Sequence, residues 1–287
     1  MKKVLSSRRF ILIAIVGFLG ASSVLFVFYF HAMTETNYYN KYGQTPRAAI
    51  IDQLYDDYPN LYFQETAKKD LQYAGYTVDL YTTKNITVSF YKNLPLMEYK
   101  FIVIRSHASL SYTNNTKTAS ADLFTGEKYR PDKYTLEQIQ GLVDQSNYIY
   151  QDYGVIHYAN GSYSLHNSAS ASGSYFSVGS KFVDQQMQGK FPGTIVLIGG
   201  CASLSNPILA DSLVKRGTST IIGWNKLVTS GHNDAAMLIV LNSLLVDKSD
   251  VADAIKTSMD RLGPDPLFSS VLKYYPASAG NIQVEMN

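Results

Sequence analysis

Residues 10–30 form an uninterrupted stretch of 21 uncharged, mainly apolar residues, FILIAIVGFLGASSVLFVFYF. A helix of about 20 such residues, rising 1.5 Å per residue, is long enough to cross the hydrocarbon core of a bilayer. A cleaved signal peptide usually has an apolar region of only about 7–15 residues that ends at a small-x-small site. Because this stretch is longer and ends in aromatic residues, the sequence predicts an uncleaved transmembrane signal anchor.

The charges on either side of this stretch predict its orientation. Four basic residues precede it within the first nine positions, and Glu35 is the first charged residue after it. By the positive-inside rule, the N-terminus is then cytoplasmic and the catalytic or binding part lies outside the cell membrane. We therefore expect a single-pass protein with these parts: a cytoplasmic N-terminus (1–9), an anchor (10–30), a polar stalk (31–45) and an extracytoplasmic domain (46–287).

The composition is that of an ordinary globular domain beyond the anchor. The chain is 46% hydrophobic and 17% charged, which excludes disorder and a collagen-like fold. Without the four N-terminal cations it has 21 basic and 23 acidic residues, so the body is slightly acidic. Nucleic-acid binding requires a basic surface, and we expect no nucleic-acid partner.

Apolar runs and amphipathic segments alternate along residues 46–287. Short β-branched runs such as IVLIG and TSTIIGW are typical of buried parallel strands. The alternation predicts an α/β fold with a mostly parallel, doubly wound sheet and helices on both faces. Strands are predicted at 47–52, 76–81, 101–105, 194–198 and 218–223, and helices at about 61–74, 180–188, 207–215, 233–246 and 249–262.

A segment rich in Ser, Tyr, Asn and Gly, about 108–178, interrupts this alternation. A structureless loop of that length is uncommon in a compact domain. We therefore expect a β-hairpin around 123–129 and a small helix at about 135–144. Because the segment lies between two predicted sheet strands, we expect it to form a lid or a wall of the site.

Two predicted strands run directly into a residue with acid–base or nucleophilic chemistry. FIVIRSHAS places His107 after one strand, and TIVLIGGCAS places Cys201 after another. The carboxyl ends of parallel strands share one edge, where ligands bind, so this nucleophile and its partner are expected to face one substrate. Gly199 and Gly200 are expected to allow a tight turn and leave room for substrate, and the amides of Ala108 and Cys201 are candidate oxyanion donors.

Cys201 is the only cysteine of the chain, so it cannot form an internal disulfide. The following Ser205-Asn206-Pro207 predicts the start of a helix, and a helix N-terminus near a thiol lowers the thiol pKa. A free cysteine can equally be a buried, inert side chain. The position of Cys201 after two glycines at a strand end favours the catalytic interpretation.

These segments resemble the caspase-like cysteine peptidases of clan CD, which include caspases, legumains, gingipains, clostripains and CHAT-domain proteases. The resemblance covers the element order over about 47–262, and its specific motifs are the strand ends at His107 and Cys201 and the trailing ILADSLVKRGTSTIIGWNKLV. It implies a caspase-like α/β/α sandwich and a Cys201 nucleophile with His107 as general acid or base. The implied activity is cleavage of a protein or peptide substrate, or acyl transfer from it, through a thioester.

The resemblance also implies that residues around the strand after Cys201 wall the substrate pocket. Arg105 and Ser106 directly precede His107 and are candidates to orient the imidazole or a substrate carboxylate. The candidate pocket residues are Arg105, Ser106, Trp224, Asn225, Lys226 and His232.

The chain departs from the family pattern in the site itself. Ala108 stands where a Gly usually follows the histidine, and Gly199-Gly200 stands where an acidic or amide residue often precedes the cysteine. The caspase signature Gln-Ala-Cys-x-Gly is absent. Substrate preference therefore does not transfer, and a catalytically inactive caspase-like binding module remains an alternative.

His232 is a rival partner for Cys201, because amidotransferase-type cysteine hydrolases carry the histidine after the cysteine. GGCAS also resembles a nucleophile elbow, a strained strand-to-helix turn. Asp56 and Asp57, after the first strand, could bind calcium or a basic side chain, but solvated loop acids are the default. His157 and His166 are a weak zinc pattern, and we expect neither a metal nor a cofactor.

Overall fold

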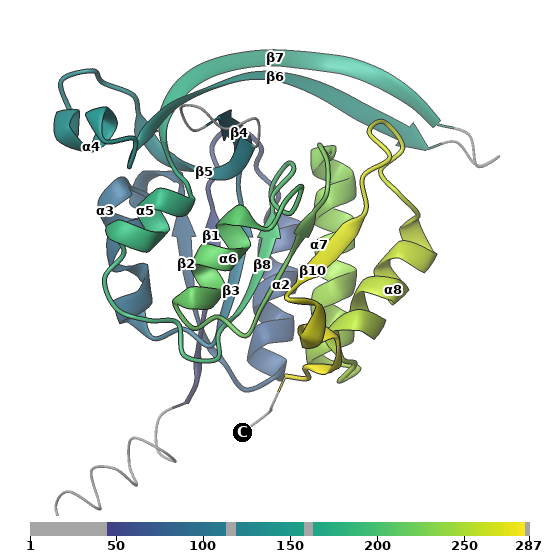
Figure 1. Ribbon diagram of the computed structural model, residues 1–287. Helices are drawn as coiled ribbons and strands as arrows, with labels where there is room; N and C mark the ends of the chain where they lie inside the picture. The colour runs from purple at the N-terminus through teal and green to yellow at the C-terminus, as the bar shows by residue number, and fades with distance from the viewer. Residues whose placement is uncertain (1–44, 113–118, 158–162, 285–287) are drawn as a thin grey trace, which may run out of the picture. The chain divides into compact units, whose positions relative to one another are not determined.

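A six-stranded sheet with the order β10-β9-β8-β3-β1-β2 runs through the centre of the domain (Figure 1). β10 pairs antiparallel with β9, and every other neighbouring pair is parallel. The strands are β1 (Arg47–Asp52), β2 (Thr77–Thr82), β3 (Phe101–Arg105), β8 (Ile195–Gly199), β9 (Thr220–Trp224) and β10 (Leu272–Tyr275). The α/β class and the mostly parallel sheet predicted from the sequence are confirmed.

This computed structural model describes residues 45–112, 119–157 and 163–284. Residues 46–287 form one compact unit of the chain, which is described here by itself. The predicted anchor at 10–30, and the stalk at 31–45 except for its last residue, lie outside the described residues. Within the described part, no helix combines the length and the apolar character that a membrane span requires.

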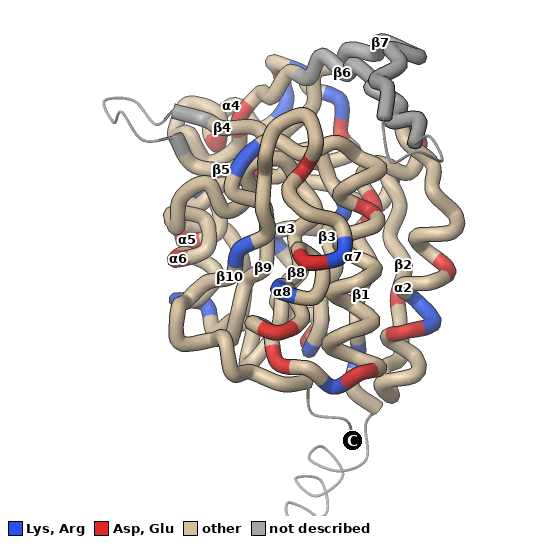
Figure 2. Tube along the Cα trace, turned by 90° about the vertical axis from the view of Figure 1, so that its right-hand side faces the viewer, with Lys and Arg blue, Asp and Glu red and all other residues tan. Residues whose placement is uncertain are grey.

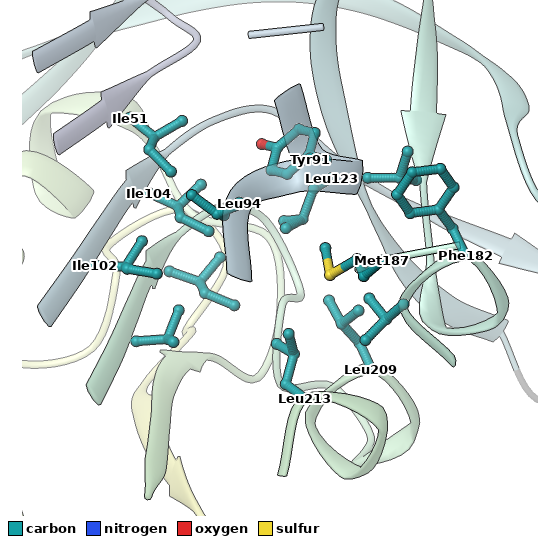
Figure 3. Close-up of a cluster of buried hydrophobic side chains, with 14 of the residues drawn as sticks. Ile51, Tyr91, Leu94, Ile102, Ile104, Leu123, Phe182, Met187, Leu209 and Leu213 are labelled. Carbon is teal, nitrogen blue, oxygen red and sulfur yellow. The ribbon is translucent and has the colours of Figure 1, made fainter. Parts of the chain in front are cut away.

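Helices cover both faces of the central sheet (Figure 1). Alternate strand residues point to opposite faces, and two apolar cores result. One core joins Ile104 and Ile198 to α3 (Val88–Asn93), α5 (Ser180–Gln185) and α6 (Ile208–Lys215), as Figure 3 shows in part. The other joins Val103 and Leu197 to α2 (Leu61–Tyr73), α7 (Ser230–Leu245) and α8 (Val251–Leu262). The predicted helices are all present, with bounds shifted by a few residues.

The segment from Ala108 to Val178 forms a second, antiparallel sheet with the order β4-β5-β7-β6. Its strands are β4 (Ala108–Tyr112), β5 (Ala119–Lys128), β6 (Asp144–His157) and β7 (Tyr163–Val178). The hairpin predicted around 123–129 is wrong, because that stretch is the end of strand β5. The small helix is α4 (Thr135–Ile139), shorter than expected.

The second sheet is joined to the first through its base. Ala121, Leu123, Val143, Phe176 and Val178 belong to the same apolar core as the central strands β3 and β8. Beyond this base, β6 and β7 continue as a long antiparallel pair (Figure 1).

Charged residues are interspersed along the elements of the domain. In the view of Figure 2, Lys, Arg, Asp and Glu are scattered among mostly uncharged residues.

Candidate functional site

Strands β3 and β8 are parallel neighbours and end at the same level. Arg105 pairs with Gly199, and the Ser106 amide donates a hydrogen bond of 3.1 Å to the Gly199 carbonyl. His107 and Cys201 each follow this pair by two residues. The main chain therefore carries both residues past the carboxyl edge of the sheet side by side.

The segment before Cys201 contacts the segment that contains His107. A Cβ atom added at Gly200 would lie 3.0 Å from the Ser106 carbonyl oxygen and 3.2 Å from the Ala108 Cβ. A Cβ at Gly199 would lie only 2.0 Å from the Met237 Sδ of α7. The two glycines thus allow close packing of neighbouring segments, and the space expected beside them for substrate is occupied by protein.

The turn after β8 is built around Ala202 rather than around a glycine. Ala202 has a φ of 53°, in the left-handed region. Its amide donates to the Lys226 carbonyl at 2.8 Å, and the Cys201 Sγ donates to the Val228 carbonyl at 3.6 Å. Residues 225–229, which we call the β9 loop, therefore contact Cys201 and Ala202, and Cys201 remains partly exposed.

Asp265 holds the β9 loop in place. Its buried carboxylate accepts hydrogen bonds from the Thr229 amide and hydroxyl at 2.9 and 2.8 Å. It also accepts from the amides of Leu267 and Phe268, at 2.9 and 2.8 Å. A buried carboxylate with four donors is well compensated, so it fastens the β9 loop to the segment after α8.

Burial raises the pKa of the Cys201 thiol, and the negative charge of Asp265 raises it further. The lowered thiol pKa expected from the sequence is therefore wrong. The helix that was expected to lower it, α6, packs through Leu209 and Leu213 on one face of the sheet, whereas Cys201 packs with the core on the other face. The dipole of α6 therefore does not lower the pKa of the Cys201 thiol.

His107 is held by its main chain and enclosed by neighbouring groups. Its amide donates to the Gln53 Oε1 at 2.9 Å, and its ring lies edge-on to Phe124 with 5.8 Å between centroids. Burial lowers the pKa of His107 to about 4, with Asp57 opposing the shift and Arg105 adding to it. At neutral pH the site thus holds a neutral imidazole and a neutral thiol rather than an ion pair.

A buried ion cluster lies directly before His107. Arg105 Nη1 donates to Asp52 at 2.8 Å, and its Nε and Nη2 donate to Asp234 at 2.8 and 2.9 Å. Arg105 and Asp52 are 0% exposed. Burial acts to lower the pKa of the Arg105 guanidinium, but the two carboxylates raise it above its ordinary value. The Arg105 side chain therefore binds Asp52 and Asp234 and fixes the end of β3. It does not bind a substrate carboxylate, although the sequence had suggested this.

The Ala108 amide remains a candidate oxyanion donor. The His107 carbonyl accepts a hydrogen bond from Phe124 of β5 at 3.2 Å. The C=O and N–H of one trans peptide point in opposite directions, so the Ala108 N–H, which shares a peptide with the His107 carbonyl, points away from β5. Ala108 also lies against Gly200, which directly precedes Cys201. The Ala108 and Cys201 amides are therefore close to each other at the carboxyl edge of the sheet.

The other predicted pocket residues fall into two groups. Ser106 and Trp224 are buried, and their side chains bond within the protein, to the His107 carbonyl and to Asn233. Lys226 is exposed, and Asn225 is half-buried with its side chain accepting from the Val271 amide. His232 lies in the first turn of α7, 5.6 Å from the Trp224 ring, on the face of the sheet where Cys201 packs.

Sequence reasoning considered Asp57 only as a solvated acid or a ligand for calcium or a basic side chain, and it missed Asp52 and Asp234. Asp52 and Asp234 bind Arg105, and Asp57 acts on the imidazole. Asp52 ends a predicted strand and Asp57 follows it, which was the available signal for two of the three. A scan against protein-family models and a search of curated proteins each found no match to this chain.

Proposed function

We propose that this chain is a membrane-anchored, extracytoplasmic cysteine peptidase or transpeptidase of the caspase-like type, with Cys201 as nucleophile and His107 as its acid–base partner. The observation that carries the proposal is the register of β3 and β8. The matched pair Arg105 and Gly199 leads both chemical groups past the same edge of the sheet at the same level. In this proposal residues 10–30 anchor the protein and residues 46–287 face away from the cytoplasm.

Because the Cys201 thiol and the His107 imidazole are both neutral, the thiol must lose its proton as it attacks. His107 accepts the thiol proton as Cys201 Sγ attacks the peptide carbonyl, and the amides of Cys201 and Ala108 stabilise the oxyanion. The imidazolium then donates this proton to the leaving amine as the C–N bond breaks, which leaves a thioester. Water gives hydrolysis and an amine gives transpeptidation. The bond between the thiol and the Val228 carbonyl must open before attack.

A second arrangement pairs Cys201 with His232. Both side chains lie on the α7 face of the sheet, where His232 contacts Trp224 and Cys201 packs with the core that contains Trp224. This arrangement corresponds to a cysteine hydrolase of the amidotransferase type. The same experiment distinguishes the two pairings.

The test uses the full-length protein in detergent and a panel of fluorescent peptidyl acyloxymethyl ketones. Wild type is compared with Cys201→Ala, His107→Ala and His232→Ala, each checked for folding by thermal denaturation. We expect labelling to be lost in the first two variants and kept in the third. Product analysis with an added amine then separates peptidase from transpeptidase.

The remaining outcomes each favour an alternative. Loss of labelling in His232→Ala with retention in His107→Ala identifies the second pairing. A folded wild type that neither reacts with the panel nor cleaves a peptide library identifies an inactive binding module, in line with the raised pKa of the Cys201 thiol.

A further inference from the structure

Strand β4 begins directly after His107 and forms one edge of the second sheet. On one side it pairs antiparallel with β5, with Ala108 opposite Leu123 and Leu110 opposite Ala121. In the part of the chain that the structure describes, no strand pairs with its other side, which we call the open edge of β4. This open edge therefore starts at the residue next to the proposed acid–base partner.

The register with β5 decides which main-chain groups of β4 point to the open edge. The Phe124 amide donates to the His107 carbonyl, so these two residues form a hydrogen-bonded pair. Hydrogen-bonded and non-hydrogen-bonded pairs alternate along an antiparallel ladder, so Ala108 and Leu110 are non-hydrogen-bonded positions toward β5. The N–H and C=O groups of both residues therefore point to the open edge.

Ser109 holds β4 against the rest of the second sheet. Its hydroxyl lies 2.9 Å from the Ser146 hydroxyl of β6, which lies 2.7 Å from the Ser177 hydroxyl of β7. Ser146 and Ser177 are buried. These bonds join β4 to two strands besides its ladder partner β5, so the open edge is held in position.

β4 lacks the side chains that usually prevent pairing at a sheet edge. Charged residues and prolines on an edge strand oppose the addition of another strand. The other edge strands of the two described sheets carry such charges, at Asp79 in β2, Lys273 in β10 and Asp144 in β6. The sequence of β4, ASLSY, has none, and its Leu110 is 41% exposed. The edge is therefore suited to an extended peptide.

The open edge also starts beside the segment that carries Cys201. A Cβ atom at Gly200, the residue before Cys201, would lie 3.2 Å from the Ala108 Cβ. The Ala108 amide, the candidate oxyanion donor, is the first N–H group of the open edge. One row of main-chain groups therefore leads from the candidate reaction centre along β4.

We propose that the substrate binds as an extended peptide that adds antiparallel to the open edge of β4. This inference rests on the proposed function. When the carbonyl of the first residue before the scissile bond accepts from Ala108, an antiparallel register places the third residue before that bond opposite Leu110. The third residue then donates to the Leu110 carbonyl and accepts from the Leu110 N–H. Directly opposed side chains share one face, so the exposed Leu110 side chain favours an apolar third residue.

N-methyl scanning of the probe tests this register in the full-length wild type. Three peptidyl acyloxymethyl ketones of one sequence are compared, in which the residue with the ketone is the first residue. One is unmethylated, and the others are N-methylated at the second or at the third residue. Methylation of the third residue should slow labelling at least about tenfold, because it removes a hydrogen bond and places a methyl group against β4. The second N–H points away from β4, so its methylation should change the rate by less than about threefold.

Two substitutions of Leu110 separate its main chain from its side chain, each checked by thermal denaturation. Leu110→Pro removes the N–H at the open edge, where a strand tolerates proline. It should slow the unmethylated probe, and methylation of the third residue should then have little further effect. Leu110→Ala keeps the N–H and should reduce the preference for leucine over serine as the third residue.

Equal rates for the two methylated probes, or slower labelling by the probe methylated at the second residue, overturn the inference. Failure of the proposed function has a different signature, because no probe then labels the wild type. In that case the same peptides, ending in a carboxamide, are added to the full-length protein and hydrogen exchange of the Leu110 amide is measured. Protection of that amide supports peptide addition at the open edge, and unchanged exchange overturns it.

Discussion

Arg105 has all its guanidinium nitrogens bonded in a position that solvent does not reach. The Arg105 Cζ lies 5.6 Å from the centroid of the Phe63 ring. Helix α2, which carries Phe63, therefore packs against the ion cluster. Removing one partner of a buried ion pair leaves the other charge without compensation in a poorly solvated site. The end of β3, and with it His107, depends on this cluster.

We expect Arg105→Gln to lower the free energy of unfolding by about 3–5 kcal/mol, because Asp52 and Asp234 lose their cation. Urea denaturation measures this change. The matched control is Arg130→Gln, because Arg130 and its partner Asp132 are 65% and 67% exposed and such pairs stabilise little. Equal stability of the two variants would show that the Arg105 cluster does not support the fold.

At the level of residues, local pattern placed His107 and Cys201 after their strands but did not indicate their electrostatic environment. His107 and Cys201 are visible because each follows an apolar strand, and strand ends are set by local pattern. Asp234 lies 129 positions from Arg105. No local pattern connects them. The raised thiol pKa and the lowered imidazole pKa likewise arise mainly from burial, which only the folded domain produces.

Among the elements, the β9 loop is the one that contacts the thiol. Val228 accepts the thiol hydrogen bond, and Thr229 is bound to Asp265. A raised thiol pKa means that less thiolate is present at neutral pH, and alkylation needs the thiolate. We therefore expect iodoacetamide to modify wild-type Cys201 more slowly than a free cysteine at pH 7.5. The rate should keep rising at pH values where a free thiol has already levelled off.

Asp265→Asn should increase this alkylation rate severalfold and shift its pH dependence to lower pH. The substitution removes a negative charge near the thiol and weakens the bonds that hold the β9 loop. Because Cys201 is the only cysteine, mass spectrometry of the intact chain follows the reaction. Asp260→Asn on the exposed side of α8 is the control, and a rate increase as large in that variant would contradict a specific role for Asp265.

Element prediction succeeded in the buried strands and failed where contacts are distant. The β-branched runs of β3, β8 and β9 are readily identified as strands, because both faces of these strands are buried and their sequences are continuously apolar. Gly126 in the predicted hairpin looks like a turn residue. In the structure its amide donates to Ile86, and a Cβ there would lie 1.8 Å from the Thr83 carbonyl oxygen. This glycine permits close backbone contact within β5, where the pairing register shifts.

The whole domain combines two apolar cores with an inserted sheet that belongs to one of them. Phe176 and Val178 of β7 pack in the same core as Ile198 of β8. These residues lie near the base of the inserted sheet, while the strands of the β6–β7 hairpin continue far beyond it. The base of the hairpin therefore belongs to the apolar core that stabilises the domain.

We expect the domain to fold without the distal hairpin. Asn147 and Ser174 are directly paired, so an Asn-Gly turn that replaces residues 148–173 closes the shortened hairpin. The melting temperature should change by less than about 4 °C, because the core residues at the base remain. Phe176→Ala, which truncates one of these buried residues, should instead cost about 3–5 kcal/mol.

The same shortened chain tests the expectation from the sequence that the segment 108–178 forms a lid or a wall of the site. Bulky peptidyl ketones should label it faster than they label wild type, while iodoacetamide, which is small, should react at an unchanged rate. Equal gains for both reagents would indicate that the truncation disturbs the β9 loop rather than removing a cover. A loss of melting temperature as large as that of Phe176→Ala would place the distal hairpin within the stabilising structure.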